Sequence, residues 1–395
     1  MNNAELAQAA QALGTPLYIF DDRVLQKRVA YLASFMPENV KLCYAVKANT
    51  FIIPLLKESV ASFEICSTGE ARICQEAGVN PAMMVISGVN KDVDFMEELI
   101  STQPDVHRYT VESRLQFDQL RALAAKHGVR IPLLLRLTSG NQFGLDKAQL
   151  KAIVADFADD AYVDLVGIQY FSGTQKMSTK RLARELRSVA KMKDALQQEF
   201  GFNCREIEFG TGFPVQYFDD EPFDEDAFLA EFAQMLRDFP FEGPITLEIG
   251  RSIAASCGTF LTNVVDAKTN AGQNYAIVDG GMNHLVYFGQ SLAMRQPQVD
   301  LLQAPARLEA GEPVQPWNIC GSLCSVNDIL AKQLELPGLR VGDTLAFRNT
   351  GAYCMTEGIS LFLSRDLPQV ALVDGAGEAH LVRQVVPTYP LNGCR

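Results

Sequence analysis

The feature that most constrains the fold of this sequence is a regular alternation of short apolar runs with longer segments of helical periodicity. The runs lie at Leu42–Asn49, Phe63–Cys66, Met83–Ser87, Arg108–Glu112, Ile131–Leu137, Leu165–Phe171, Arg205–Phe209 and Ile245–Ile249. The segments between them, such as Leu115–His127 and Lys180–Phe200, carry apolar residues three and four positions apart, as amphipathic helices do. Eight such units favour a closed (β/α)8 TIM-type barrel over an open sheet. No glycine-rich dinucleotide fingerprint follows the first strand, which further weakens the open-sheet alternative.

The sequence changes in character after about residue 252. Short alternating strands follow, at Thr259–Val265, Asn274–Val278, Asp343–Phe347 and Val370–Leu372. Their pattern predicts an antiparallel β domain, to which the first twenty residues add a helix and the strand at 16–20. We therefore expect an α/β protein with a barrel at 24–255 and a β domain made of 1–23 and 256–395.

Composition restricts the kind of function. A formal net charge of −12 opposes binding to nucleic acid and to anionic membranes. The first residues lack a secretory pattern and no window is long and apolar enough for a membrane helix, so we expect a cytoplasmic protein. The nine cysteines are scattered, as reduced thiols are, and without a CxxC or HExxH motif we expect no metal site. Small-molecule chemistry is the default expectation.

Candidate catalytic residues lie where the predicted barrel strands end. Lys47 closes an apolar run with no opposite charge beside it in sequence, and a buried lysine is suited to covalent binding of an aldehyde. The alternative is an ammonium that reaches out to water. Phe171 leads into the segment 172–175, and Gly210-Thr211-Gly212 forms a turn whose backbone amides can approach a phosphate. The alternative for this turn is a simple tight bend.

Glu248 ends another apolar run, and a buried carboxylate there requires a cationic partner. Arg251, three residues later, is one candidate for that partner. The other is a pyridinium nitrogen, which a carboxylate would keep protonated, as pyridoxal chemistry requires.

Six motifs in order resemble the signatures of a known family. They are Tyr44-Ala45-Val46-Lys47-Ala48-Asn49, Phe63-Glu64-Ile65-Cys66-Ser67-Thr68-Gly69-Glu70, Gly210-Thr211-Gly212-Phe213-Pro214, Glu248-Ile249-Gly250-Arg251, Cys320-Gly321-Ser322-Leu323-Cys324-Ser325-Val326-Asn327-Asp328 and Gly351-Ala352-Tyr353. They are similar to those of the fold-type III pyridoxal-phosphate-dependent decarboxylases, which have an alanine racemase-like fold and include the ornithine and diaminopimelate decarboxylases. The likeness runs from about residue 14 to residue 365.

The resemblance implies pyridoxal 5'-phosphate as cofactor and a role for each matching residue. Lys47 would bind the cofactor covalently and Glu248 would pair with its ring nitrogen. Cys324 would act as proton donor in the neighbouring subunit's site, so the active sites would be shared across a homodimer. The full set of implied cofactor-binding residues is Lys47, Phe171, Thr174, Gly210, Thr211, Gly212, Glu248, Gly250, Arg251 and Tyr353.

The chain also departs from the family pattern, and the departures concern the substrate. Phe171 replaces the histidine that family members stack on the ring. Ser325 stands where the family has an acidic residue that reads a distal amino group. The run that follows Asn283, residues His284 to Gly289, lacks the arginine that diaminopimelate decarboxylases use for a distal carboxylate. These positions resemble the divergent branch that decarboxylates modified amino acids, including citryl-diamino acids of siderophore pathways and glutamyl groups on a carrier protein.

We therefore expect removal of the α-carboxylate from a distally acylated diamino acid. The alternatives are free diaminopimelate, ornithine or lysine as substrate, an amino-acid racemase, and a non-catalytic cofactor carrier. The candidate substrate-binding residues are Arg251, His284, Ser325 and Asp328. Gln290 and Arg295 are weaker candidates for the far end of the substrate.

Overall fold

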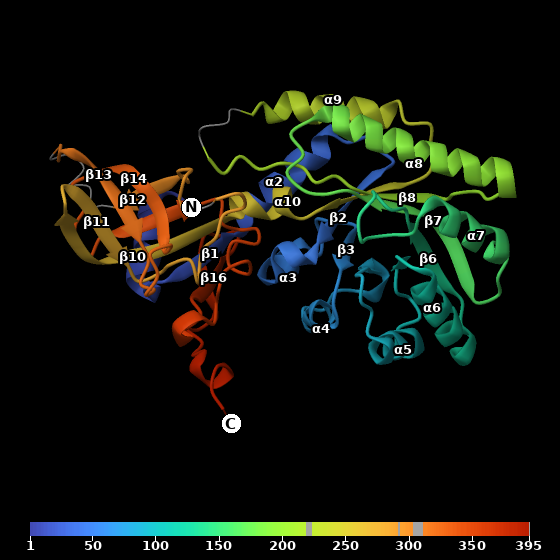
Figure 1. The fold of residues 1–395 in the computed structure, drawn as a ribbon, viewed down its shortest axis with the longest axis horizontal. Helices are drawn as coiled ribbons and strands as arrows, with labels where there is room; N and C mark the ends of the chain where they lie inside the picture. Colours follow the sequence, from blue (N-terminus) through green and yellow to red (C-terminus); the bar gives the residue numbers. More distant parts are fainter. Residues whose placement is uncertain (219–222, 291–292, 303–310, 395) are drawn as a thin grey trace. The chain divides into compact units, whose positions relative to one another are not determined.

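The computed structural model describes residues 1–218, 223–290, 293–302 and 311–394 (Figure 1). The chain divides into two compact units. One comprises Val29–Pro214 and Asp224–Ile253, and the other comprises Met1–Arg28, Val215–Phe223 and Ala254–Arg395, of which the described residues are considered below.

The first unit is built on a closed barrel of eight parallel strands, as the sequence predicts. The strands are β2 Val40–Ala45, β3 Ser62–Ile65, β4 Met84–Ile86, β5 Arg108–Val111, β6 Ile131–Arg136, β7 Val163–Phe171, β8 Glu206–Gly210 and β9 Ile245–Ile249. The barrel closes where β2 pairs with β9, from Val40 opposite Ile245 to Tyr44 opposite Ile249. Because successive side chains alternate between the two faces of a strand, every second residue points into the barrel.

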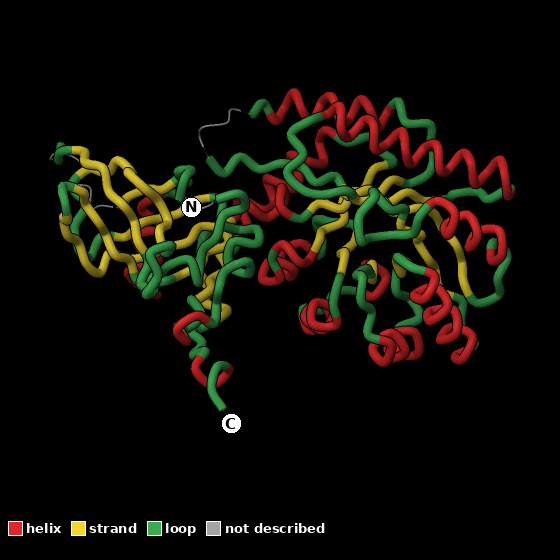
Figure 2. Tube along the Cα trace, in the orientation of Figure 1, coloured by secondary structure: helices red, strands yellow, loops and turns green. Residues whose placement is uncertain are grey.

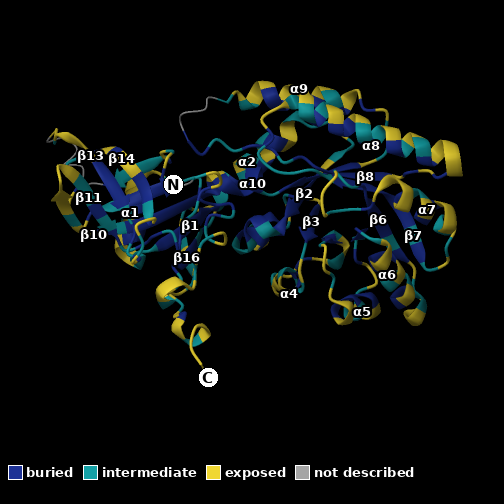
Figure 3. Ribbon diagram, viewed as in Figure 1, coloured by how far each residue is buried: buried dark blue, intermediate teal, exposed yellow. Residues whose placement is uncertain are grey.

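Helices alternate with the barrel strands along the chain (Figure 2). They are α2 Asp22–Phe35, α3 Ile53–Leu56, α4 Thr68–Glu76, α5 Val93–Thr102, α6 Arg114–His127, α7 Lys147–Phe157, α8 Thr179–Phe200, α9 Glu225–Arg237 and α10 Arg251–Ala254. Several begin at a residue whose side chain accepts a backbone N–H, as Ser67 does for α4 and Ser113 for α6. Figure 3 shows buried and exposed residues on opposite faces of the longer helices, as amphipathic helices require. Among the described residues, no helix combines the length and apolar character needed to cross a membrane.

The second unit holds a nine-stranded sheet and helix α1 Asn3–Leu13. Its strands are β1 Leu17–Asp21, β10 Gly258–Asn270, β11 Gln273–Val278, β12 Val299–Leu302, β13 Val314–Cys320, β14 Ile329–Pro337, β15 Thr344–Arg348, β16 Gln369–Val373 and β17 Ala379–Arg383. The sheet is mainly antiparallel, as the sequence predicts, but two of its pairings are parallel. β1 pairs with β16 in parallel, and β11 does so with β13, so the sheet is mixed and mainly antiparallel. Leu6 of α1 packs with Leu17, Ile19 and Leu261 in the core of this unit.

Candidate active site

Lys47 lies immediately after β2, in a short 3-10 turn at Val46–Ala48. Its Nζ is 2.5 Å from Oε2 of Glu64 at the end of β3, and 3.5 Å from Sγ of Cys66. The side chain of Lys47 is 38% exposed, whereas that of Glu64 is 5% exposed. The sequence offers Lys47 no neighbouring acid, but the adjacent strand supplies one.

The ionisation of Glu64 follows from this pairing. Burial alone would raise the pKa of the Glu64 carboxyl, but the ammonium of Lys47, together with the Cys66 hydrogen bond and the charge of Arg136, holds the pKa below its usual value. Glu64 is therefore a carboxylate that holds the amine of Lys47 in place.

Glu248 is buried on β9 and is bound by a neighbour inside the barrel. Nε2 of Gln169, on β7, donates a hydrogen bond of 2.8 Å to Oε1 of Glu248. Burial, followed by the negative charge of Glu64, raises the pKa of Glu248. A cationic group brought to Glu248 would offset both effects, because it would favour the ionised form.

Glu208, on β8, is a second fully buried acid in the barrel. Burial, followed by the charge of Glu248, raises the pKa of Glu208 well above its usual value. Neither of its carboxyl oxygens has a hydrogen-bond donor among the described residues. Glu208 is therefore the member of the pair that keeps a proton, which it can donate to Glu248.

The turn after β8 is shaped by glycine. A Cβ at Gly210 would overlap the ring of Phe171, and a Cβ at Gly212 would overlap the carbonyl oxygen of Gly173. Gly212 also has a φ of +59°, a conformation that other residues seldom adopt. Thr211, between them, is fully buried. Glycine at these two positions lets the loops after β7 and β8 pack directly against each other.

Further residues complete this region of the barrel. Nε of Arg251 donates to Oγ1 of Thr174 at 3.3 Å, which connects the residue after β9 with the loop after β7. A Cβ at Gly250 would lie 3.0 Å from Cβ of Ala48 and 3.1 Å from Cβ of Ala45. Gly250 therefore lets the end of β9 approach the segment that carries Lys47.

The structure thus brings together the predicted barrel residues around two neighbouring features, an acid–amine pair and a glycine turn. The sequence alone predicts no role for Glu64, Cys66, Gln169 or Glu208. Glu64 and Cys66 do occur in a motif that carried the resemblance. For Gln169 and Glu208, the available signal was a polar residue at an inward-facing position of an otherwise apolar strand.

The remaining predicted residues belong to the second unit. Cys324 is exposed in the loop between β13 and β14. In the same loop, Asp328 accepts the backbone N–H groups of Met282 at 2.7 Å and of Leu323 at 2.8 Å, and Oγ of Ser325 accepts that of Asn327 at 3.2 Å. Burial raises the pKa of Asp328. These side chains hold the loop in its conformation.

His284 and Tyr353 have well-defined surroundings in that unit. The His284 ring is buried, its Nε2 lies 2.8 Å from the carbonyl oxygen of Asp366, and burial lowers its pKa. Tyr353 has a φ of +65°, a strained conformation for a non-glycine residue. The predicted roles of both in binding stay predictions.

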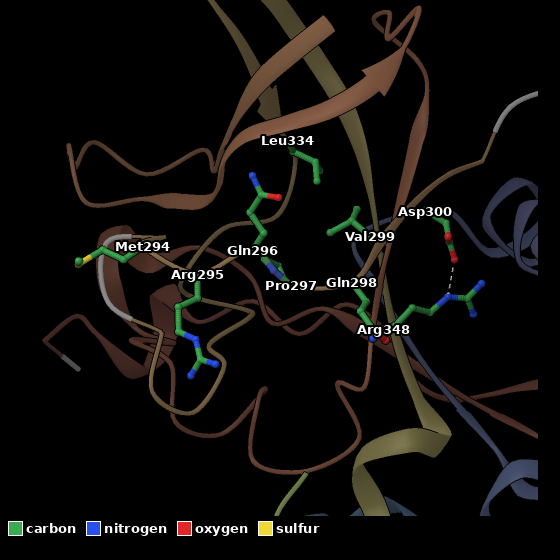
Figure 4. Close-up of a pocket in the computed structure, with 9 residues that line it drawn as sticks. All are labelled: Met294, Arg295, Gln296, Pro297, Gln298, Val299, Asp300, Leu334 and Arg348. Atoms are coloured by element: carbon green, nitrogen blue, oxygen red, sulfur yellow. Dashed lines mark hydrogen bonds and ion pairs between the residues drawn. The ribbon is translucent and has the colours of Figure 1, made fainter. Parts of the chain in front are cut away.

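Arg295, a weaker sequence candidate, lines a pocket of about 740 Å³ in the same unit (Figure 4). Its guanidinium lies 4.3 Å from the ring centroid of Phe218. The other cation of this pocket, Arg348, pairs with Asp300 at 2.7 Å. Gln290 donates to the carbonyl oxygen of Leu330 at 2.9 Å. We assign no ligand to this pocket.

Comparison with known proteins identifies the family. The family described as "Pyridoxal-dependent decarboxylase, pyridoxal binding domain" matches residues 22–255. A diaminopimelate decarboxylase from Pseudomonas aeruginosa is 30% identical over 399 residues, which cover 96% of this chain and 92% of its own length. The chain belongs to the pyridoxal-dependent decarboxylases. It is a pyridoxal-phosphate-dependent amino-acid carboxy-lyase of fold type III.

Two further relatives of this decarboxylase bear on its fold and substrate. The crystal structure of diaminopimelate decarboxylase from Helicobacter pylori in complex with L-lysine has a TM-score of 0.85 at 23% identity, over 98% of both chains, and it shows the same fold. An L-glutamyl-(BtrI acyl-carrier protein) decarboxylase from Niallia circulans is 24% identical over 409 residues, which cover 97% of this chain and 94% of its own length.

The barrel residues fit pyridoxal 5'-phosphate. A ring nitrogen that carries a proton would be a cationic partner for the buried Glu248, and the glycine turn with Thr174 and Arg251 offers groups of the kind that bind a phosphate. Lys47 would provide the amine that binds the aldehyde. When bound, the cofactor supplies an electron sink for the bond that breaks at the α carbon.

Proposed function

We propose that this decarboxylase removes the α-carboxylate of an amino acid whose distal end is acylated, such as a citryl-diamino acid. The proposal rests on the residues at the positions where family members bind a charged group at the distal end of the substrate. Ser325 provides a hydroxyl in place of an acid, and the carboxylate of Asp328 already accepts two backbone N–H groups. Neither residue offers a free carboxylate to a distal ammonium.

The residue at the place where the family binds a distal carboxylate also favours an acylated substrate. His284, in the run that lacks the expected arginine, is buried against the carbonyl oxygen of Asp366, and its pKa is lowered, so it is a neutral ring. An arginine that binds a distal carboxylate, or an acid that binds a distal ammonium, contributes about 1.5–3 kcal/mol per charge-assisted hydrogen bond. A free diamino acid would forgo these contacts, whereas an acylated one would not need them.

The relative from Niallia circulans supports a modified substrate. By its description it acts on a glutamyl group held by a carrier protein, and it matches this chain over nearly its whole length. None of the relatives named above is described as a siderophore enzyme. The citryl group therefore rests on sequence resemblance alone.

The barrel residues would act in the reaction as follows. Glu248 would accept the hydrogen bond of the ring nitrogen and keep it protonated, while Gln169 orients the carboxylate. Whenever the amine of Lys47 is not bound to the cofactor, Glu64 would hold it at its Oε2, where the amine can take up or deliver a proton. Arg251 would bind the phosphate or the substrate carboxylate.

A second candidate is decarboxylation of free diaminopimelate, ornithine or lysine. The relative from Pseudomonas aeruginosa, which is a diaminopimelate decarboxylase, supports it more directly than any named relative supports an acylated substrate. The two candidates share every step in the barrel. They differ only in how the far end of the substrate is bound.

We also propose that the enzyme is a homodimer in which Cys324 completes the partner's site as proton donor. Cys324 is exposed, and Val326, two residues on, is 90% exposed. The loop is thus at the surface of its own unit, where another subunit could approach. Sedimentation equilibrium tests the assembly, and mixing Lys47→Ala with Cys324→Ala subunits tests the sharing, because only mixed dimers would regain activity.

The experiment that decides the substrate is a measurement of carbon dioxide release from a panel of free diamino acids and their citryl and other acyl derivatives. Lys47→Ala serves as the blank. Turnover of an acylated compound alone supports the first candidate, whereas turnover of a free diamino acid at an ordinary enzymatic rate refutes it and establishes the second. Ser325→Asp restores the acid that the family pattern has, so it should raise kcat/KM for a free diamino acid by about tenfold or more.

A further inference from the structure

A fully buried lysine, Lys176, lies in the loop that follows β7 and contacts the turn after β8. The side chain of Lys176 is 0% exposed. Lysine is seldom buried completely, because an ammonium loses its hydration unless protein groups replace it. No step of the decarboxylation described above uses Lys176.

Lys176 connects the two loops of the glycine turn. Its Nζ donates to the carbonyl oxygen of Gly210 at 3.3 Å, and its backbone N–H donates to that of Gly212 at 2.9 Å. The ammonium also lies 5.6 Å from the ring centroids of Phe171 and Phe209, within cation–π distance. One residue therefore contacts both ends of Gly210-Thr211-Gly212 and the aromatic ring packed on it.

Lys176 shares its nearest counter-ion with a second cation. Glu185, on α8, accepts from Nζ of Lys176 at 2.7 Å and from Nε of Arg181 at 3.0 Å. Oγ of Ser172 also donates to Glu185, at 2.5 Å. Two cations thus share the carboxylate of Glu185, and the negative charge of Glu248 also acts on Lys176. Burial lowers the pKa of Lys176, and the hydrogen bond that Lys176 donates to Glu185 opposes that effect.

A buried ion pair is weak evidence of a gain in stability. An apolar side chain of similar volume often replaces a buried ion pair at no loss of stability. The ammonium is hydrogen-bonded to a turn that is suited to binding an anion, which suggests a role in anion binding.

We infer that Lys176 is a positioning residue for the cofactor phosphate. It fixes the Gly210-Thr211-Gly212 turn through its hydrogen bonds to Gly210 and Gly212, and it places a positive charge next to the turn. The ligand class is a phosphate monoester dianion. This inference rests on the proposed phosphate role of the turn, but it is independent of which amino acid the enzyme decarboxylates.

The test compares the binding of pyridoxal phosphate and of pyridoxal to apoenzyme freed of its cofactor. Both aldehydes can react with the same lysine, so the ratio of their dissociation constants isolates the phosphate. In Lys176→Met we expect the dissociation constant of pyridoxal phosphate to rise at least tenfold, while that of pyridoxal stays within about twofold. An equal loss for both ligands, or no loss for either, overturns the inference.

Arg108→Met is the matched control. Arg108 forms an ion pair with Glu206 at 2.6 Å, which also involves β8, but at the opposite ends of the strands from the turn. Its removal should leave the ratio of the two dissociation constants unchanged, and a change equal to that of Lys176→Met would refute a specific role for Lys176.

Glu185→Gln provides a second variant should Lys176→Met fail to fold. It removes the counter-charge of Lys176 and keeps an acceptor for its hydrogen bond, so the preference for pyridoxal phosphate over pyridoxal should increase at least twofold. A decrease would contradict the inference. These binding ratios can hold even if the substrate panel fails, which separates this inference from the proposed function.

Discussion

The hydrogen bond between Gln169 and Glu248 gives the sharpest prediction. Both side chains are buried, and the bond of 2.8 Å favours the ionised carboxylate. Replacing Gln169 with leucine removes a bond to a charged group, which contributes about 1.5–3 kcal/mol, or about 1–2 pKa units. Since the lost bond holds the pKa of Glu248 down, the pKa of Glu248 should rise further in Gln169→Leu.

The expected consequence is a shift of the acid limb of activity. Glu248 must be ionised to keep the ring nitrogen protonated, so a higher pKa means that activity is lost at a higher pH. The acid limb of kcat/KM should move up by about 1–2 pH units, with a fall of about tenfold or more at the pH where the original enzyme begins to lose activity. Carbon dioxide release measured against pH, with the best substrate of the panel, reads this directly.

Gln116→Leu is the control for this prediction. Gln116 is also buried, and its Nε2 donates to the carbonyl oxygen of Val89 at 2.9 Å, outside the set of residues around Glu248. This variant can lose stability but should keep the original acid limb. An unshifted limb in Gln169→Leu, or the same shift in Gln116→Leu, would refute the assignment of the limb to Glu248.

Two further variants test other parts of the site. Lys47→Ala should abolish carbon dioxide release and covalent cofactor binding, which absorbance measures. It should also raise the pKa of Glu64, because the cationic partner of Glu64 is gone. Covalently bound cofactor in this variant would show that another lysine is used. Gly210→Ala should lose about 1–3 kcal/mol of stability in urea unfolding and weaken cofactor binding, because the added methyl overlaps the Phe171 ring. Gly69→Ala, whose methyl would approach only Oγ of Ser67 at 3.8 Å, is the control, and equal losses in both variants would contradict the packing argument.

The sequence predicts the barrel better than the β unit, for a physical reason. Barrel strands are buried on both faces and therefore read as continuous apolar runs. β17 alternates between exposed and half-buried residues, and β13 contains Pro316, so neither gives a clear signal. The first predicted strand was too long, because the chain leaves β2 after Ala45 and turns before Lys47. An apolar run does not distinguish a strand from the buried turn that follows it.

The site could be predicted at its strand ends but not inside the barrel. Lys47 and Glu248 stand out because each closes an apolar run. The roles of Glu64 and Glu208 can be recognised only in the closed barrel, where side chains from several strands meet in one interior. Lys176 and Glu185 meet because a loop folds back on a helix, which the spacing of nine residues does not reveal.

The position of β1 has a consequence for how the protein is made. β1 lies between β10 and β16, and Leu17 pairs with Leu261 and with Gln369, roughly 350 residues later. At synthesis rates of about 5–20 residues per second, β16 emerges about 20–70 seconds after β1. All eight barrel strands are made in that interval, so the barrel can form while β1 still lacks its partners. During this time the apolar strand Leu17–Asp21 presents unpaired edges, and protection by a chaperone would be most valuable there.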